Sequence, residues 1–507
     1  MDERVTPLGI APNRGRLPRK VVVVMQGFML DSARCLESRD YYRRFIRFAA
    51  EQGANTILWH FSDDQGCSLR LDSLPDAASP NAYTKAEIRE LITYARDLGI
   101  ELIPELASLG HTRFITRLPQ YADLAEDEGF YSSICPCDPR TPKLLARLLA
   151  EVLEIFDAPL VHIGGDEVNI GHHPLTKRQL ENRTTGELFA EHMVRLHEQV
   201  SAAGKRTMMW ADQLLSDPTI APLLPKDILM CNWQYQPGAC SSTTKRLLDW
   251  GFEVVVCPAL ISHNQPIYPA ESFAYPNVRA MAEHRTLSPR VIGMLTTIWT
   301  PTRFMADALW PAVHYAAAVM RDGPAVDPRA NLADFGRTFY GLEPTDAWLD
   351  AMLRLQQSVP KRDAWAAVAQ LSPTLTRTST ALRETASLFQ SILANLLEAR
   401  DSVQTNLHSY NRLLLLVEVL AHAWERAAAW QSGKLSPKQL QQSRCLMRRL
   451  SQAWDADRFA DDPRKHDCSQ LYDVADHLLL LLAEGTRVYE NALSEPETEY
   501  VAGAAGR

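Results

Sequence analysis

Eight short apolar runs, separated by segments with helical periodicity, constrain the fold of this chain more than any other feature. The runs lie at residues 21–25, 56–61, 101–106, 160–164, 207–210, 228–233, 253–258 and 294–299. Helical patterns that follow such runs cover residues 41–52, 84–98, 142–156, 186–203, 243–250 and 305–320. Short continuous apolar strands that alternate with amphipathic helices predict a parallel sheet with both faces covered.

The number of these units decides between two kinds of α/β fold. Eight units in about 300 residues predict a closed (β/α)8 barrel, the TIM barrel. The alternative is an open doubly wound sheet, in which a glycine-rich phosphate loop follows the first strand. Here residues 26–29, with the sequence QGFM, follow that strand instead. The barrel is therefore the predicted fold.

The last third of the chain has a different character. Gly323-Pro324 and Asp327-Pro328 mark a linker, and residues 381–400, 407–430, 437–454 and 471–493 repeat apolar side chains at helical spacing. We therefore expect an N-terminal extension at residues 1–20, a barrel at 21–322 and an all-α C-terminal domain at 323–507. The leucine-rich stripes of that domain predict helix packing, and a homodimer contact is the alternative.

Composition excludes several classes of function. The net charge of −8 over 507 residues provides no basic surface for nucleic acid and disfavours an anionic membrane. Residues 1–20 lack the apolar segment of a signal peptide, and later apolar runs are too short to span a bilayer. We expect a cytoplasmic protein without a membrane partner. The nine scattered cysteines predict reduced thiols, and the Cys135-Pro136-Cys137 pair alone is a weak metal signal.

Polar and aromatic residues follow the predicted strands. In a barrel of this kind, functional side chains lie at the C-terminal ends of the strands. The residues at those positions are Asp31, Arg34, Asp63, His111, Asp166, Glu167, Trp210, Asp212, Trp233, Tyr235, His263, Asn264 and Trp299. Aromatic rings stack on the apolar face of a sugar, while carboxylates and amides bind its hydroxyl groups. The combination predicts a carbohydrate ligand.

Residues 161–168, with the sequence VHIGGDEV, carry the two acids at the fourth strand end. Consecutive residues in a strand point to opposite faces, so Asp166 and Glu167 share one site only if the chain leaves strand geometry there. Gly164 and Gly165 permit that departure. The alternative is that Asp166 caps the following helix and that Glu167 is solvated. For His162, which precedes the turn, we expect a hydrogen-bonded core histidine rather than a ligand.

The segment HIGGDE at residues 162–167 resembles the signature of the family 20 glycoside hydrolases, the β-N-acetylhexosaminidases. Supporting stretches occur in the family's order at residues 29–34 (MLDSAR), 63–66 (DDQG), 82–88 (AYTKAEI), 103–105 (IPE) and 110–111 (GH). The resemblance extends over about residues 21–320. We expect a chain without the small α/β domain that usually precedes the barrel, and residues 110–135 are similar to the compact hexosaminidase D-like branch.

This resemblance implies a retaining, exo-acting enzyme that removes a terminal N-acetylhexosamine from a glycan. The substrate's acetamide oxygen attacks the anomeric carbon, so that no protein nucleophile and no cofactor or metal is required. Glu167 would be the general acid/base with a raised pKa, and ionised Asp166 would orient the acetamide. His111 and Asp63 would tune Glu167. The residues expected to wall the sugar subsite are Trp210, Trp233 and Trp299.

Several residues depart from the family pattern. The family places an arginine at the end of the first strand to hold the 3- and 4-hydroxyl groups, and we assign that position to Gln26. Cys67 stands where a tryptophan is expected, and the family's Tyr-x-Asp pattern is absent after the seventh strand. We expect Tyr235 to hold the acetamide oxygen. The choice between N-acetylglucosamine and N-acetylgalactosamine stays open.

Two other functions remain as alternatives. The first is a sugar-binding barrel that lost catalysis together with the arginine at position 26, although a lectin would have no need of Glu167. The second is a metal-dependent hydrolase with His111, His162, Asp166 and Glu167 as ligands. The sequence lacks a His-x-His pair at a strand end, which disfavours the second alternative.

Overall fold

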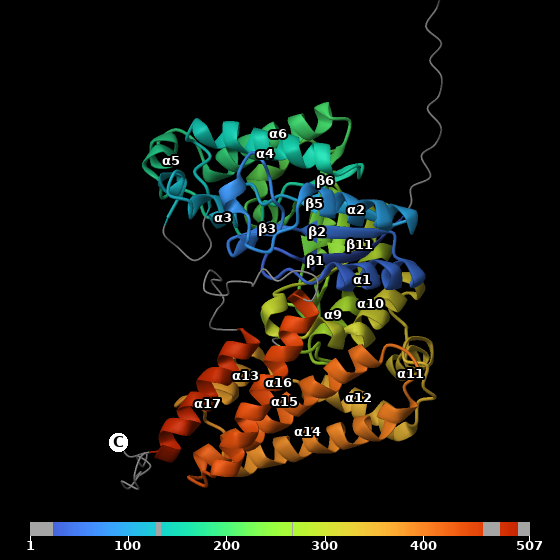
Figure 1. Cartoon of the computed structure of the whole chain (residues 1–507). Coiled ribbons are helices and arrows are strands. Elements are labelled where there is room, and N and C mark those ends of the chain that lie inside the picture. Colours follow the sequence, from blue (N-terminus) through green and yellow to red (C-terminus); the bar gives the residue numbers. More distant parts are fainter. Residues whose placement is uncertain (1–23, 128–132, 266, 460–476, 495–507) are drawn as a thin grey trace, which may run out of the picture.

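The computed structural model describes residues 24–127, 133–265, 267–459 and 477–494, and it confirms the barrel (Figure 1). Its eight parallel strands are β1 (Met25–Asp31), β2 (Thr56–His60), β5 (Glu101–Glu105), β6 (Leu160–His162), β7 (Arg206–Trp210), β8 (Leu229–Trp233), β9 (Glu253–Cys257) and β11 (Val291–Ile298). Neighbours pair in this order, and β1 also pairs with β11, which closes the sheet. The remaining strands are a hairpin of β3 (Ser62–Asp63) and β4 (Gly66–Cys67), and β10 (Ala259–Ile261), which pairs with β11.

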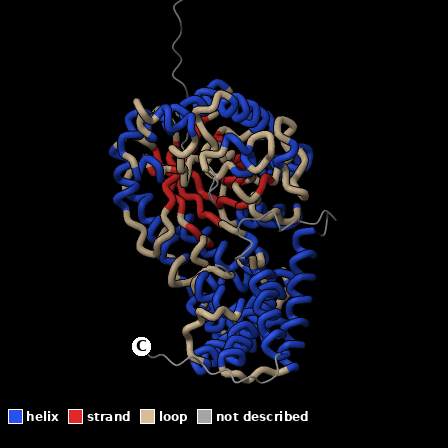
Figure 2. Tube along the Cα trace, turned by 90° about the vertical axis from the view of Figure 1, so that its left-hand side faces the viewer, coloured by secondary structure: helices blue, strands red, loops and turns tan. Residues whose placement is uncertain are grey.

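Helices enclose the strands on the outside of the barrel (Figure 2). They are α1 (Arg39–Glu51), α2 (Lys85–Asp97), α3 (Arg113–Thr116), α4 (Arg140–Ile155), α5 (Pro174–Gln179), α6 (Thr185–Ala202), α7 (Asp212–Ser216), α8 (Ser241–Asp249), α9 (Ala274–Glu283) and α10 (Trp310–Asp322). Helices α2 and α6 begin with capping boxes, in which Thr84 pairs with Glu87 and Thr184 with Glu187. The Thr-x-x-Glu spacing fixes both helix starts by satisfying backbone donors of the first turn.

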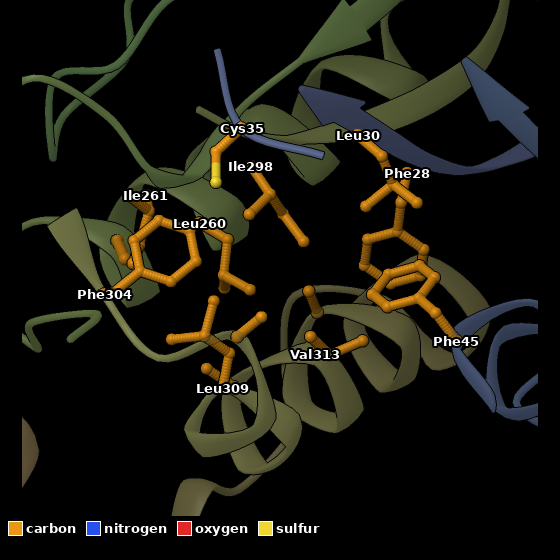
Figure 3. Close-up of a cluster of buried hydrophobic side chains, with 14 of the residues drawn as sticks. Phe28, Leu30, Cys35, Phe45, Leu260, Ile261, Ile298, Phe304, Leu309 and Val313 are labelled. Carbon is orange, nitrogen blue, oxygen red and sulfur yellow. The ribbon is translucent and has the colours of Figure 1, made fainter. Parts of the chain in front are cut away.

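Two apolar layers hold the barrel together. Met29, Leu58 and Ile103 are fully buried in its interior. The outer layer lies between the sheet and its helices, where Phe28 and Ile298 meet residues of α1 and α10 (Figure 3). Each fully buried side chain of this size contributes about 1.5–3 kcal/mol relative to an exposed one.

The first strand lies further along the chain than its apolar run predicted. The predicted end at Met25 is wrong, because β1 begins there and continues to Asp31. Val24 is 43% exposed, and residues 21–23 fall outside the described part of the chain. Gln26 is accommodated in the strand because its side-chain amide donates to the carbonyl oxygen of Met320 at 3.0 Å. The other seven predicted strands differ from the observed ones only at their ends.

The described residues beyond the barrel form helices, as predicted. They are α11 (Pro328–Phe339), α12 (Asp346–Ser358), α13 (Arg362–Gln370), α14 (Ser379–Ala399), α15 (Leu407–Gln431), α16 (Pro437–Phe459) and α17 (Leu478–Ser494). Leu413, Leu416 and Leu420 of α15 are fully buried, which confirms that this leucine stripe packs internally. We call these seven helices the helical region. Among the described helices, none is long and apolar enough to cross a membrane. The proposed domain boundaries themselves stay a prediction.

Candidate active site

The chain leaves strand geometry directly after β6. Gly164 and Gly165 have φ angles of 69° and 97°, and Glu167 has a φ of 46°, all in the left-handed region. Glycine adopts this conformation without steric cost, whereas Glu167 must be held in it by its surroundings. Its backbone N–H donates to the Oδ2 atom of Asp212 at 3.0 Å. The turn brings two consecutive acids to the same site.

His111 is the group that both acids face. Its Nε2 atom lies 3.5 Å from Oδ2 of Asp166 and 3.3 Å from Oε2 of Glu167. Its Nδ1 atom lies 3.2 Å from Oδ2 of Asp64 and 3.6 Å from Oδ2 of Asp63. The structure therefore joins His111, Asp63, Asp166 and Glu167 in one cluster, as the strand-end rule predicted. A simple helix cap does not account for this arrangement.

Gly110 allows the loop of His111 to approach the turn of Asp166. A Cβ atom at this position would lie 2.2 Å from the backbone oxygen of Asp166, which no side chain tolerates. His111 itself has a φ of 53°. A bulkier residue at position 110 would displace the imidazole from the two acids.

A second layer of charged residues lies beneath this cluster. His60 lies between two carboxylates, with Nε2 2.9 Å from Oδ2 of Asp63 and Nδ1 2.9 Å from Oε2 of Glu105. The indole N–H of Trp210 donates to Oε1 of Glu105 at 2.6 Å. We did not predict His60, and Asp64 and Glu105 appeared only within the family-like stretches at residues 63–66 and 103–105, without a role in the site. His60 and Glu105 end β2 and β5, so the strand-end rule could have identified both.

The two catalytic candidates have pKa values that run opposite to our expectation. Burial raises the pKa of Asp166 to about 7, although His111 opposes that change. The hydrogen bond to His111 lowers the pKa of Glu167, against a smaller effect of burial. The Glu167 side chain is 47% exposed and that of Asp166 is 16% exposed. The expected raised pKa of Glu167 is thus wrong, because the hydrogen bond to His111 favours the carboxylate over the protonated form.

The histidines of the cluster are held as cations. Burial alone would lower the pKa of His111, but Asp166 and Asp63 outweigh it and raise the pKa well above its usual value. His60 behaves in the same way. Burial lowers its pKa, but Glu105 and Asp63 outweigh this effect and raise the pKa to about 10. Asp166 and Glu167 therefore lie beside a positive charge on His111.

Four of the predicted sugar-binding residues are linked by hydrogen bonds and stacking. The indole N–H of Trp299 donates to the Tyr235 hydroxyl at 2.7 Å, and that of Trp233 donates to Oδ1 of Asp212 at 3.2 Å. The rings of Trp233 and Tyr235 stack with centroids 5.1 Å apart. Trp210 is fully buried, and its ring lies 6.1 Å from that of Trp299. The predicted aromatic residues therefore form one contiguous cluster, in which the side chain of Trp210 is buried beneath the others rather than exposed.

Gln26 is the predicted site residue that the structure places elsewhere. It is the second residue of β1, at the N-terminal end of the barrel, and the site lies at the other end. The error follows from the strand, which we expected to end at Met25. Arg34 follows the true strand end. Its guanidinium lies 2.9 Å from Oδ2 of Asp31, 2.9 Å from Oδ2 of Asp63, and 5.5 Å from the ring centre of Trp299.

Substitutions at these two positions should differ strongly in their effect on KM. For the N-acetylhexosaminide that the sequence resemblance implies, we expect Arg34→Met to raise KM by about 10- to 100-fold, because charge-assisted hydrogen bonds contribute about 1.5–3 kcal/mol. Gln26→Ala should leave KM within about twofold, since its loss affects only the bond to Met320 at the far end of the barrel. Steady-state kinetics of both variants checks this. A larger KM effect from Gln26→Ala would restore the original assignment.

The remaining predicted positions have simple structural roles or lie near the rim. His162 is fully buried and its Nδ1 atom accepts the N–H of Gly164 at 3.0 Å, which confirms a hydrogen-bonded core histidine. The Cys135 thiol lies 3.2 Å from the hydroxyl of Thr176. His263 is exposed at the seventh strand end, and the carbonyl oxygen of Asn264 accepts the N–H of Arg362 at 3.2 Å.

Curated proteins of known name are similar in sequence to about half of this chain. The Beta-hexosaminidase of Vibrio furnissii is 27% identical over 327 residues, which cover 54% of this chain and 52% of that protein. The Probable beta-hexosaminidase of Arthroderma benhamiae is 26% identical over 262 residues, or 46% of this chain and 42% of that protein. The chain thus spans about half the length of the curated relatives it matches.

Solved structures support the fold. The chitobiase of Flavobacterium johnsoniae superposes with a TM-score of 0.51 and 19% identity, covering 90% of this chain and 78% of that one. A family model described as "Glycosyl hydrolase family 20, catalytic domain" matches residues 25–300, which include every residue of the cluster around His111. The chain belongs to glycosyl hydrolase family 20.

Proposed function

We propose that this protein is an exo-acting, retaining β-N-acetylhexosaminidase that hydrolyses terminal β-linked N-acetylglucosamine or N-acetylgalactosamine. The observation that carries the proposal is the approach of both Asp166 and Glu167 to Nε2 of His111. Two acids that face one site can divide the work of orienting a substrate and moving a proton. The names of the curated relatives support the same activity.

The proposed reaction needs no nucleophile from the protein. The acetamide oxygen of the substrate attacks the anomeric carbon, and the bond from that carbon to the leaving oxygen breaks. Glu167 gives its proton to the leaving oxygen, so the aglycone departs as an alcohol and the sugar remains as an oxazolinium ion. Glu167, now a carboxylate, takes a proton from water, which attacks the same carbon and regenerates the acetamide with retained configuration.

Glu167 must gain a proton before it can act as the acid. Its carboxyl group is half exposed in the free site, and the hydrogen bond to His111 lowers its pKa. A bound sugar would displace water from this side chain, and loss of hydration disfavours the charged form of a carboxyl group. Substrate binding is therefore the step that raises the pKa of Glu167 in this proposal.

Asp166 is suited to hold the acetamide. Its carboxylate would accept the substrate N–H and stabilise the positive charge of the oxazolinium ion, which requires the ionised form. The cation of His111, 3.5 Å away, favours that form against the effect of burial. In this proposal Tyr235, whose hydroxyl oxygen accepts the indole N–H of Trp299, donates its own hydroxyl proton to the acetamide oxygen.

Arg34 takes over the role that we first assigned to Gln26. The family's arginine at the end of the first strand holds the 3- and 4-hydroxyl groups, and Arg34 stands at that end of β1. Its charge is oriented by Asp31 and Asp63. A barrel that lost catalysis together with an arginine at position 26 stays the alternative, and turnover of an acetamido sugar would exclude it.

The test uses three chromogenic substrates. Aryl β-N-acetylglucosaminide and aryl β-N-acetylgalactosaminide carry the acetamide, and the matching aryl β-glucoside does not. We expect turnover of one or both acetamido sugars and none of the glucoside above background, since the glucoside lacks the internal nucleophile. The ratio of the first two gives the preference at the 4-hydroxyl. Equal turnover of the glucoside would contradict the proposal.

A chelator separates this mechanism from a metal-dependent one. Asp63, Asp64 and His111 lie close enough together to hold an ion, whereas His162 instead binds the Gly164 N–H. The proposed mechanism gives the first three residues only a role in proton handling. We therefore expect activity to be unchanged after dialysis against EDTA. Loss of activity that added divalent metal restores would favour the metal-dependent hydrolase.

Localisation and assembly stay predictions. We propose a cytoplasmic enzyme, with the homodimer as an open alternative for its assembly. Cell fractionation and light scattering on the full chain measure these two properties directly.

A further inference from the structure

Arg458 connects the helical region with the rim of the barrel. It lies near the C-terminal end of α16, the end of this helix that is close to the barrel (Figure 1). Only 4% of the residue is exposed. Its Nε–H donates to Sγ of Cys35 at 3.2 Å, and an Nη2–H donates to Oε1 of Glu37 at 2.7 Å. Nη2 also lies 3.3 Å from the carbonyl oxygen of Pro301 and 3.4 Å from that of Phe304.

The four acceptors belong to two loops that carry sugar-site residues. Cys35 and Glu37 lie on the loop after β1, which also carries Arg34, and Cys35 directly follows that arginine. Pro301 and Phe304 lie on the loop after β11, two and five residues beyond Trp299. The side chains of Cys35 and Phe304 meet the same apolar cluster as residues of β1 and β11 (Figure 3).

The same two loops are joined a second time, next to the site. The N–H of Thr300 donates to Oδ2 of Asp31 at 3.0 Å, and Asp31 also pairs with Arg34 at 2.9 Å. Thr300 has a φ of 56°, so this connection is made by strained backbone. Asp31 thus fixes the loops on the side of the sugar site, and Arg458 fixes them on the side of the helical region.

An arginine is the side chain suited to this position. Its planar fork donates in several directions at once, so that one guanidinium reaches both loops, whereas a lysine offers one compact charge. The charge is compensated by Glu37, and the guanidinium carbon lies 3.4 Å from the ring centre of Trp454. Removing such a buried partner leaves Glu37 uncompensated and both loops without their common donor.

A neighbouring contact anchors the helical region at the same corner. Asp307, after β11, accepts from Arg44 of α1 and from the hydroxyl of Ser409 on α15 at 2.8 Å. Asp457, adjacent to Arg458, pairs with Arg412 of α15 at 2.7 Å. Helices α15 and α16 are therefore fixed to each other and to the barrel where Arg458 enters it.

We infer that Arg458 is a positioning residue of the sugar site, through which the helical region holds Arg34 and Trp299 in register with each other. The inference rests on the proposed function only for its kinetic consequence. It gives the helical region a part in substrate binding through the loops after β1 and β11 rather than through contact with the sugar.

The kinetic test compares two buried arginines. Arg458→Met should raise KM for the better aryl N-acetylhexosaminide by about 10- to 100-fold, because small displacements of binding groups have effects of this size. The control is Arg426→Met. Arg426 is equally buried, but among the described residues its hydrogen bonds go to Ala369, Leu482 and Thr486, all within the helical region. It should lower the thermal midpoint while leaving KM and kcat within about twofold.

A second readout does not depend on activity. Hydrogen–deuterium exchange should rise in both loops, residues 32–38 and 299–309, in Arg458→Met and in neither loop in Arg426→Met. If the wild type hydrolyses no N-acetylhexosaminide, the proposed function fails, and the exchange result still decides the positioning role. Unchanged exchange in both loops, or an unchanged KM in active enzyme, overturns the inference.

Arg458→Lys covers the case in which the methionine variant does not fold. The lysine retains a charge for Glu37 but cannot donate to both loops together. We expect an intermediate rise in KM and faster exchange in at least the loop after β11. A lysine variant with the KM and the loop exchange of the wild type would show that no bridging donor is needed, and would overturn the inference.

Discussion

Glu167→Gln is expected to lower kcat for a glycan substrate by roughly 100- to 10,000-fold, the range by which a general acid contributes to catalysis. The glutamine has nearly the same shape, so it can remain beside His111, which lies 3.3 Å from the carboxylate in the wild type. It has no acidic proton to give to the leaving oxygen. The loss should therefore appear in kcat far more than in the binding of the sugar.

The leaving group distinguishes loss of the acid from general damage. An aryl substrate with a very acidic phenol departs without protonation, so the variant should retain much more of its first step on that substrate. The matched control is Glu101→Gln at the start of β5, on the opposite end of the barrel, which should behave as wild type. Near-normal turnover of a glycan with a poor leaving group by Glu167→Gln would contradict the assignment.

Asp166→Asn should lower kcat by roughly 100- to 1,000-fold, the cost of removing one electrostatic stabiliser of the transition state. It should also change the pH dependence. Because the pKa of Asp166 in the free site is about 7, kcat/KM of the wild type should fall as the pH drops through that value and the carboxylate becomes neutral. The residual activity of the asparagine variant should lack this acid limb.

Added azide should not restore the rate of the asparagine variant, since no covalent enzyme intermediate forms.

The same substitution should stabilise the folded protein at high pH. Burial raises the pKa of Asp166 from 3.8 to about 7, so its ionisation opposes folding. Each tenfold loss of acidity lowers the free energy of unfolding of the ionised protein by about 1.4 kcal/mol. This cost is absent below pH 4 and complete above pH 7. Asp166→Asn should therefore raise the thermal midpoint at about pH 8 and change it much less at about pH 5. A variant that is destabilised in alkaline buffer would contradict the predicted cost.

The barrel could be predicted because most of its strands are continuous apolar runs. Val254, Val255 and Val256 of β9, for example, are all fully buried, which requires covered faces on both sides of the sheet. The first strand could not be placed by the same rule. The valine run before it is more apolar than β1 itself, which contains Gln26 and ends at Asp31. Tertiary hydrogen bonds that satisfy Gln26 leave no trace in local sequence.

The acids and the histidine at the centre of the site could be predicted, but His60 and Glu105 beneath them were missed, and the charges of the whole cluster could not be predicted. Asp166, Glu167, His111 and Asp63 follow from strand ends and the turn after β6, and the structure brings them together. Their protonation depends on distances of about 3–4 Å between loops from different strands, which the sequence does not specify. Arg458 illustrates the limit, since it meets Cys35 across 423 positions of the chain.

The most direct test of the central claim is the effect of fluorine on the acetamide of the substrate. We propose to measure kcat/KM for aryl glycosides that carry N-acetyl, N-fluoroacetyl, N-difluoroacetyl and N-trifluoroacetyl groups. Fluorine withdraws electrons from the amide oxygen, so its attack on the anomeric carbon weakens with each substitution. We predict a steep, continuous fall in kcat/KM across the series. A rate that does not depend on fluorination would show that another nucleophile attacks, and would contradict the mechanism assigned to Asp166 and Glu167.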